Sequence, residues 1–340
     1  MKKDNKKVFY WLLTGCVLIF IMVVVGGITR LTHSGLSISN YKLISGTIPP
    51  MNEVEWQEAF DLYKQYPEYQ KLNNHFTLQD FKDIYFWEWL HRVLGRFIGL
   101  VFIIPFVYFL LKKQLTKPTI KKSIILLILG GFQGFLGWYM VKSGLVDRPD
   151  VSHYRLAAHL TTAFITFAYT FWVALDIIFP NKKEINKRLR NFIRLTLAVL
   201  ILQIIYGAFV AGLDAGFIHN HWPMMSEGKF MHKTVYIEQT PVIKNFIEGK
   251  SGVQFVHRML AYIVVILVVM VWSKTRKLQL HCDQQKGANI LISIVGLQFL
   301  LGVLTILFIN DAKVLLGVSH QVGAFFLLTA TTFVLHRFSK

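Results

Sequence analysis

The chain of 340 residues is too apolar for a water-soluble protein, because 54% of its residues are hydrophobic and only 16% are charged. A soluble fold would expose too much of that apolar surface to water. The formal net charge of +18 would suit a nucleic-acid partner, but the basic residues occur in short clusters between apolar runs. That is the positive-inside pattern of membrane proteins, and the chain carries no nucleic-acid-binding motif. The expected partner is therefore the lipid bilayer and no nucleic acid.

Hydropathy predicts an all-α polytopic membrane protein with eight transmembrane helices. A bilayer core of about 30 Å requires about 20 apolar residues of helix. Stretches that meet this requirement lie near residues 8–28, 84–111, 122–142, 154–179, 192–213, 252–272, 287–309 and 314–336. The first stretch is too long for a signal-peptide core and lacks a cleavage site, so we expect it to be retained. No Arg-rich transit peptide precedes it, which favours a bacterial membrane over an organelle.

The charge of the loops predicts the orientation of the helices. Three connections are basic, with Lys112, Lys113, Lys117, Lys121 and Lys122 in the first, Lys182, Lys183, Lys187, Arg188 and Arg190 in the second, and Lys274, Arg276, Lys277 and Lys286 in the third. The opposite loops are acidic or mixed. Because basic loops remain in the cytoplasm, the sequence predicts a multi-pass protein of the bacterial cytoplasmic (inner) membrane with both termini in the cytoplasm.

Two connections on the opposite side, residues 29–83 and 214–250, are long enough to form structure of their own. Within the first, Glu53–Tyr69 is rich in Trp, Tyr and Phe, which predicts a short amphipathic helix at the outer interface. Two roles remain open for this segment: a structured cap that takes no part in chemistry, or a lid over a site at the outer face.

The two halves of the chain match each other at four places. The matched positions are Gly26 with Gly207, His91 with His257, the stretch 130–137 with 295–302, and His159 with His320. Four helices per half would give both halves the same orientation. We therefore predict two four-helix bundles related by a parallel internal repeat, with residues 1–180 (including the outer loop 29–83) as one half and residues 181–340 as the other.

Four histidines occupy matched places in this repeat: His91, His159, His257 and His320 lie on the second, fourth, sixth and eighth predicted helices. Each is expected within about two turns of the outer end of its helix. A lone membrane histidine is commonly a hydrogen-bonding core residue, but ionisable residues in spanning segments indicate function. Helix bundles build cofactor sites from facing side chains, and imidazole is an axial ligand of haem iron. Zinc or copper would require three or four ligands, so the pattern predicts two haems.

Arg92 and Arg258 directly follow two of these histidines. Guanidinium groups suit carboxylates, so we expect both arginines to pair with haem propionates. The alternative is that each side chain extends to the membrane interface without contacting a cofactor.

Glu88 distinguishes the two halves, because it lies one turn before His91 while its counterpart is Gln254. A carboxylate can transfer protons and an amide cannot. This asymmetry predicts a reaction in the first half and electron transfer or support in the second. The alternative is that Glu88 is a structural partner of Arg92 or an interfacial charge.

Several motifs together resemble the haem A synthase family over nearly the whole chain. They are Gly26-Gly27-Ile28-Thr29-Arg30-Leu31-Thr32 with Ser34-Gly35-Leu36-Ser37, Ile48-Pro49-Pro50, Glu88-Trp89-Leu90-His91-Arg92-Val93-Leu94-Gly95-Arg96, Ser143-Gly144-Leu145-Val146-Asp147-Arg148-Pro149, Tyr154-Arg155-Leu156-Ala157-Ala158-His159 and Gly207-Ala208-Phe209-Val210-Ala211-Gly212-Leu213-Asp214-Ala215-Gly216. The outer loop Glu55–Leu78 resembles the subgroup shared by mitochondria and certain bacteria, which lacks the outer-loop cysteine pair of other members. A thiol mechanism therefore cannot apply here.

The resemblance implies a membrane haem-dependent oxidoreductase that oxidises the C8 methyl group of haem O to the formyl group of haem A through successive hydroxylations. By this resemblance, His91 and His159 flank substrate haem O, His257 and His320 bind haem b, and Glu88 handles protons. Two axial histidines leave no open iron position for oxygen, so either one ligand leaves or the oxidant arises in another way.

Two other functions fit the same four histidines: a bis-histidine cytochrome b electron carrier and a haem transporter. Glu88 would be dispensable in a carrier, and a transporter would release unmodified haem. For a synthase, the candidate partners are a haem O synthase, terminal oxidase assembly factors and an electron donor that the sequence does not identify. A homo-oligomer remains open.

Overall fold

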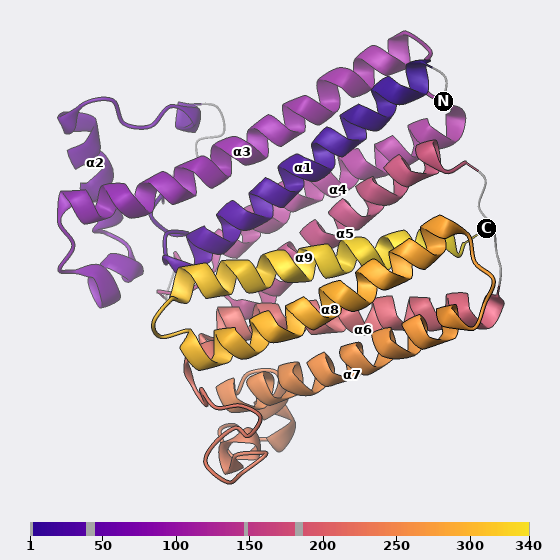
Figure 1. The fold of residues 1–340 in the computed structure, drawn as a ribbon. Helices are drawn as coiled ribbons and strands as arrows, with labels where there is room; N and C mark the ends of the chain where they lie inside the picture. The colour runs from indigo at the N-terminus through magenta and orange to yellow at the C-terminus, as the bar shows by residue number, and fades with distance from the viewer. Residues whose placement is uncertain (1–2, 39–44, 146–148, 181–185, 340) are drawn as a thin grey trace. The chain divides into compact units, whose positions relative to one another are not determined.

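A computed structural model describes residues 3–38, 45–145, 149–180 and 186–339. The basic residues Lys182 and Lys183, and the Val146-Asp147-Arg148 part of one family motif, lie outside the described residues. Within this part, eight helices are long and apolar enough to cross a membrane. They are α1 (Lys3–Leu31), α3 (Leu78–Leu111), α4 (Lys117–Lys142), α5 (His153–Ile178), α6 (Lys187–Gly212), α7 (Lys250–Arg276), α8 (Cys282–Phe308) and α9 (Lys313–Arg337) (Figure 1). The predicted class and helix count are confirmed.

Helix α3 begins six residues before the predicted start at residue 84. Thr77 and Asp80 form a capping box at its first turn: Thr77 N donates to Asp80 Oδ2 at 2.8 Å, and Asp80 N donates to Thr77 Oγ1 at 3.3 Å. Such a cap satisfies backbone groups that the helix leaves unpaired. The helix therefore starts at a polar turn that hydropathy alone does not detect.

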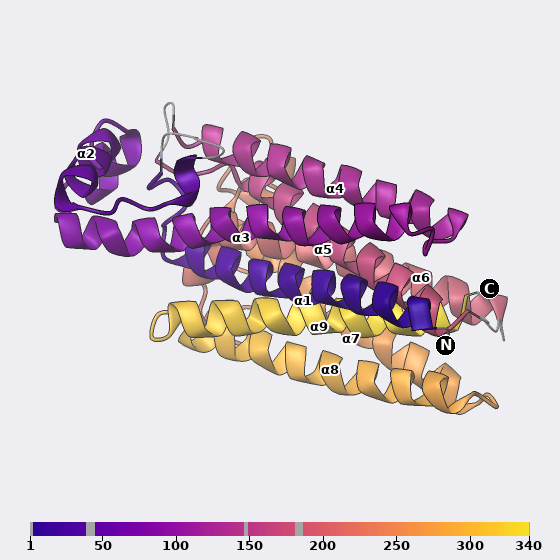
Figure 2. The ribbon, with the colours of Figure 1, turned by 90° about the horizontal axis from the view of Figure 1, so that it is seen from above.

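The chain forms two compact units, Val17–Ala163 and Met1–Cys16 with Phe164–Lys340. In the second unit α6 packs on α7, α7 on α8, α8 on α9 and α9 on α6, which closes a four-helix bundle (Figures 1 and 2). Phe167 of α5 adds a ring contact to Phe325 of α9, with centroids 3.9 Å apart. The predicted halves, residues 1–180 and 181–340, and their relation as an internal repeat remain predictions.

In the unit Val17–Ala163, helix α2 (Glu53–Tyr63) packs on the early turns of α3 (Figures 1 and 2). Phe60, Tyr63, Phe81 and Ile84 form the buried core of this region, residues 53–76 with the first turns of α3, which is called the cap below. The predicted amphipathic helix is therefore present, but it ends at Tyr63 rather than at Tyr69. Pro67 gives the reason, because the residue before a proline disfavours helical backbone. A π-helical turn (Tyr69–Asn73) follows.

The second long connection, residues 214–250, folds against the start of α7 through the short helices η3 (Ala215–Phe217), η4 (Lys233–Tyr236) and η5 (Val242–Phe246). Asn245 is fully buried and holds this segment together. Its Nδ2 donates to Gln239 O and Val242 O, both at 2.9 Å, and its Oδ1 accepts from Gln239 N at 2.8 Å. These bonds restrict the movement of Asn245 relative to residues 239–242.

Substituting Gly252→Ala is expected to destabilise this segment. A Cβ on Gly252 would collide with Asn245 O, and the hydrogen bonds of the Asn245 side chain oppose movement of that residue. Overpacking of this kind costs about 1–3 kcal/mol. Thermal unfolding in detergent should therefore occur at a lower temperature than in the wild type. Gly296→Ala on α8 is the matched control, because a Cβ there meets nothing within 4 Å; equal melting of the two variants would contradict the prediction.

Candidate functional site

The four predicted histidines lie on α3, α5, α7 and α9. His159, His257 and His320 lie six or seven residues after the first residue of their helices, as predicted. His91 does not, because α3 begins at Leu78, 13 residues earlier. At 1.5 Å per residue, about 20 Å of helix therefore precedes His91. The additional turns of α3 carry the cap formed by α2.

His257 and His320 face each other in the four-helix bundle α6–α9. Their ring centroids are 6.3 Å apart and their planes are inclined by 79°. A metal ion bound by two opposite imidazoles lies about 2 Å from each nitrogen, which separates the two ring centroids by roughly 6 Å. In addition, the buried Nδ1 of His257 has no hydrogen-bond partner among the described residues. The separation and the donor set fit axial ligation of one haem iron.

His91 and His159 both belong to the other unit, Val17–Ala163. The Nδ1 of His159 is also buried without a partner in the described part of the chain. The two residues therefore supply the same donor type as the pair in the bundle.

Three glutamines contact the histidines from neighbouring helices, although their residue type and spacing alone predicted no role for them. Gln133 Nε2 donates to His159 O at 3.3 Å, and Gln298 Nε2 donates to His320 O at 3.0 Å. Gln203 Nε2 lies 3.4 Å from His257 Nε2. Gln133 and Gln298 occupy the same position of the matched stretches 130–137 and 295–302, and that repetition was the available signal.

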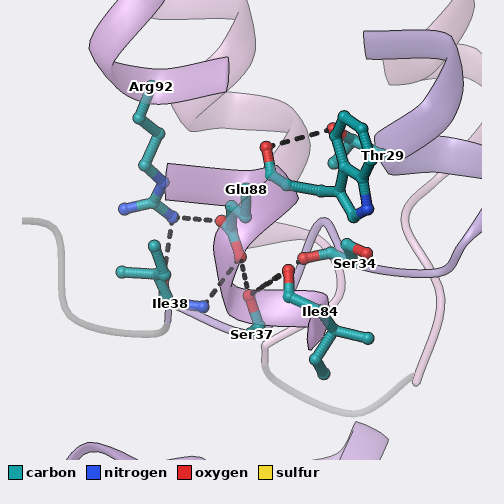
Figure 3. A network of polar contacts seen from close by, with 8 residues as sticks. Thr29, Ser34, Ser37, Ile38, Ile84, Glu88 and Arg92 are labelled. Carbon is teal, nitrogen blue, oxygen red and sulfur yellow. Dashed lines mark hydrogen bonds and ion pairs between the residues drawn. The ribbon is translucent and has the colours of Figure 1, made fainter. Parts of the chain in front are cut away.

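Glu88 is buried, with 3% of its surface exposed, and both of its carboxylate oxygens are engaged (Figure 3). Oε1 accepts from Arg92 Nη2 at 2.5 Å, and Oε2 accepts from Ser37 Oγ and Ile38 N, both at 2.7 Å. Arg92 Nη2 also donates to Ile38 O at 2.7 Å. A carboxylate is an acceptor only and matches these donors. Glu88 thus ties the segment after α1 to α3 and pairs with Arg92, while its role in proton transfer remains a prediction.

Gln254, the counterpart of Glu88, also joins the segment before its helix to that helix, but it donates hydrogen bonds where Glu88 accepts them. Its Nε2 donates to Ala215 O at 3.0 Å and to Ile218 O at 2.6 Å, and its Oε1 accepts from Arg258 Nη2 at 3.3 Å. An amide can therefore hold an outer segment against a helix in this protein. Both side chains attach a neighbouring segment to their helix. They differ because Glu88 carries a carboxyl group that accepts hydrogen bonds, whereas Gln254 carries a neutral amide that donates them.

Arg258 is buried and its guanidinium is surrounded by neutral acceptors. Nη2 donates to His219 O at 2.5 Å, and Nη1 donates to His221 O at 2.9 Å and Met224 O at 3.3 Å. No carboxylate forms an ion pair with it in the part of the chain that the structure describes. Arg92, by contrast, is paired with Glu88. The positive charge of Arg258 therefore favours an added anion more strongly.

Glu68 in the cap is a second buried carboxyl, in addition to Glu88 on α3. Its Oε2 accepts from Tyr63 Oη at 3.0 Å, and Tyr63 Oη accepts from Asn73 Nδ2 at 2.8 Å. Burial, with smaller contributions from Glu88 and Asp150, raises the pKa of Glu68 from 4.5 to about 8. The side chain is therefore mainly protonated at pH 7.

The stability of the cap is expected to decrease as the pH rises from about 4.5 to 8. The folded cap retains the Glu68 proton across this range and the unfolded segment releases it, so the folded state binds more protons. Hydrogen-exchange protection of residues 53–76, corrected for intrinsic rates, should decrease accordingly. Glu68→Gln should remove this dependence, and Glu58→Gln at an exposed position should leave it; a pH dependence that persists in Glu68→Gln would contradict the assignment.

Eight helices of membrane length and histidines on alternate helices define a multi-pass α-helical membrane protein. The chain belongs to the COX15-CtaA family of cytochrome oxidase assembly proteins, whose model matches residues 9–332. It is 61% identical to the heme A synthase of Flavobacterium johnsoniae over 100% of both chains. It is 44% identical to that of Parvibaculum lavamentivorans, over 99% of this chain and 96% of the relative. These matches confirm the family resemblance, and the bacterial relatives support a bacterial membrane.

Proposed function

We propose that this protein is a haem A synthase, an oxidoreductase that converts haem O to haem A for cytochrome oxidase assembly. The full-length match to the Flavobacterium johnsoniae heme A synthase carries this proposal. The family model supports it independently, because its description is cytochrome oxidase assembly protein. The paired histidines supply the ligands that such a reaction requires.

In this proposal His91 and His159 would hold substrate haem O, and His257 and His320 would hold haem b. Conversion of the C8 methyl group to a formyl group, written with water as the oxygen source, consumes one water molecule and releases four protons and four electrons, which an electron acceptor outside this chain must take up. Two hydroxylations give a geminal diol, which loses water. When bound, haem b supplies one-electron transfer. The 6.3 Å separation of the His257 and His320 rings supports placing haem b in the bundle α6–α9.

The chain's own acidic and basic groups have separate tasks. Glu88 accepts and releases protons beside the substrate site, and Arg92 orients its carboxylate through the 2.5 Å contact. Arg258 binds a haem propionate, which its neutral surroundings favour. Arg92 contributes to binding of a propionate of haem O. Charged hydrogen bonds of this kind position planar carboxylates well.

Both termini lie in the cytoplasm in this proposal, because the basic connection between α3 and α4 and the one between α7 and α8 belong on that side. A haem O synthase would then supply the substrate, and assembly factors of the terminal oxidase would receive the product. An electron-transfer partner completes the cycle. Self-association is an additional proposal that can be measured on the purified protein.

Expression of the chain with a source of haem O, followed by extraction and mass analysis of the haems, tests the proposed function. Haem A is the expected product. Folded, haem-loaded protein that yields no haem A would exclude a synthase. In that case, rapid exchange of unmodified haem between membranes would indicate a transporter, and electron turnover without haem modification would indicate a cytochrome b carrier.

A further inference from the structure

Each of the four histidine rings lies against a glycine of the preceding membrane helix. A Cβ added to Gly26 of α1 would lie 3.2 Å from His91 Nε2, and one added to Gly137 of α4 would lie 3.4 Å from His159 Cε1. In the bundle α6–α9 the same relation holds twice. A Cβ on Gly207 would lie 3.2 Å from His257 Cε1, and one on Gly302 would lie 3.1 Å from His320 Cε1.

Other glycines of the same helices do not make such contacts. A Cβ added to Gly130, Gly131 or Gly134 of α4, or to Gly296 of α8, would meet nothing within 4 Å. Gly134 and Gly137 are one helical turn apart, yet only Gly137 contacts a ring. Gly287 of α8 also lies close to a ring, because a Cβ there would lie 2.9 Å from Phe333 Cε1. What distinguishes the four positions is therefore that each lies against an imidazole ring.

The contacts also follow the matched positions of the sequence. Gly26 corresponds to Gly207, and the stretch that ends at Gly137 corresponds to the one that ends at Gly302. Glycine inside a helix is less favourable than alanine, but it lets a neighbouring group approach the backbone closely. At all four positions the approaching group is an imidazole ring.

We propose that Gly26, Gly137, Gly207 and Gly302 are positioning residues that allow the four imidazole rings to lie against the helix backbone in the orientation that binds haem iron. This inference rests on the proposed function, because it requires these histidines to be haem ligands. A methyl group at position 26, 207 or 302 would force the ring to shift by a few tenths of an ångström or to rotate, whereas at position 137 it would lie at the limit of ordinary van der Waals contact, so the effect there is the smallest. Such a change alters the direction of the nitrogen lone pair relative to the iron.

The expected effect is largest for Gly26→Ala. There the added methyl would meet Nε2, one of the two nitrogens able to bind iron. At the other three positions it would meet Cε1, the carbon between the two nitrogens. Gly26→Ala should therefore interfere with ligation directly, whereas the other variants should tilt the ring.

The haem b site provides the first test, with the full-length protein purified in detergent. Gly207→Ala and Gly302→Ala should lower haem b affinity on the order of 10-fold, as expected for residues that orient a ligand. They should also shift the low-spin electron paramagnetic resonance signal and the reduction potential. Gly296→Ala, the matched control on α8, should retain the wild-type affinity, signal and potential.

The substrate site provides the second test, by spectral titration with haem O. Gly26→Ala and Gly137→Ala should weaken haem O binding while haem b remains unchanged, and the control Gly134→Ala should bind haem O normally. Each variant is also examined for helical content. Loss of helix in Gly207→Ala or Gly302→Ala would contradict a positioning role, because that role predicts folded helices with displaced rings.

The two proposals fail in different ways. Wild-type haem content, resonance signal and potential in both Gly207→Ala and Gly302→Ala would overturn the positioning role even if the wild type makes haem A. Bound haem with no haem A in the wild type would overturn the synthase alone, and the glycine variants would still decide the positioning role. A wild-type chain that binds no haem would overturn both.

Discussion

The Glu88→Gln variant is expected to form haem A at least about 100-fold more slowly than the wild type, because a positioned acid–base group contributes roughly 10²–10⁴-fold to a rate. Glutamine has nearly the same shape but cannot take up or release the proton. Haem b content should remain unchanged, since the proposed haem b ligands, His257 and His320, lie on α7 and α9. The measurement is the rate of haem A formation from haem O, normalised to bound haem b.

Glu88→Gln keeps the size of the side chain, and the matched position 254 already holds a glutamine. Gln254 holds residues 215–218 against α7, and Arg258 is accommodated by neutral acceptors beside it. The surroundings of position 88 differ, because Arg92, Ser37 and Ile38 all donate to the carboxylate. An amide nitrogen there would face a donor, so the stability of Glu88→Gln is measured separately from its rate. Ser37→Ala is the matched control: it removes one donor at 2.7 Å but leaves the carboxylate and its contact with Arg92. We expect a much smaller loss of rate for Ser37→Ala.

Wild-type rates in Glu88→Gln would show that this residue only attaches the segment after α1 to α3, as Gln254 does in the other half. That result would favour the structural alternative for Glu88. A loss of rate accompanied by loss of helical content or of haem b would instead indicate a folding defect. Thermal unfolding of the same samples separates these outcomes.

The His257→Ala variant is expected to lose haem b, and haem A formation with it. Removing an axial ligand should weaken binding by more than the roughly 10–100-fold that follows loss of an outer-shell partner. His320→Ala should behave in the same way, because the two rings face each other at 6.3 Å. The ratio of haem b to protein, from extraction of the purified variants, measures the effect.

His91→Ala and His159→Ala distinguish the two sites. Both should retain haem b and lose haem O conversion, since they belong to the unit Val17–Ala163. His75→Ala, in an exposed part of the cap, is the control and should change neither quantity. Full retention of haem b in both His257→Ala and His320→Ala would show that this haem is bound elsewhere.

The sequence by itself determined the eight membrane helices, because the bilayer imposes a length of about 20 apolar residues that can be found locally. It also located the four histidines and the difference between Glu88 and Gln254. It could not locate the start of α3, because the first turns of this helix are polar and are stabilised by the cap at Thr77 and by packing against α2.

Only the tertiary structure decided which of these residues meet. Glu88 contacts Ile38, 50 residues away, and Arg258 donates to His219 O, 39 residues away. The 6.3 Å between His257 and His320, and the glycine beside each ring, depend on the rotation of each helix about its axis. Hydropathy constrains the length of a membrane helix but leaves that rotation to packing. Residue type and spacing therefore predict which residues belong to the candidate site, while the fold determines which of them are in contact.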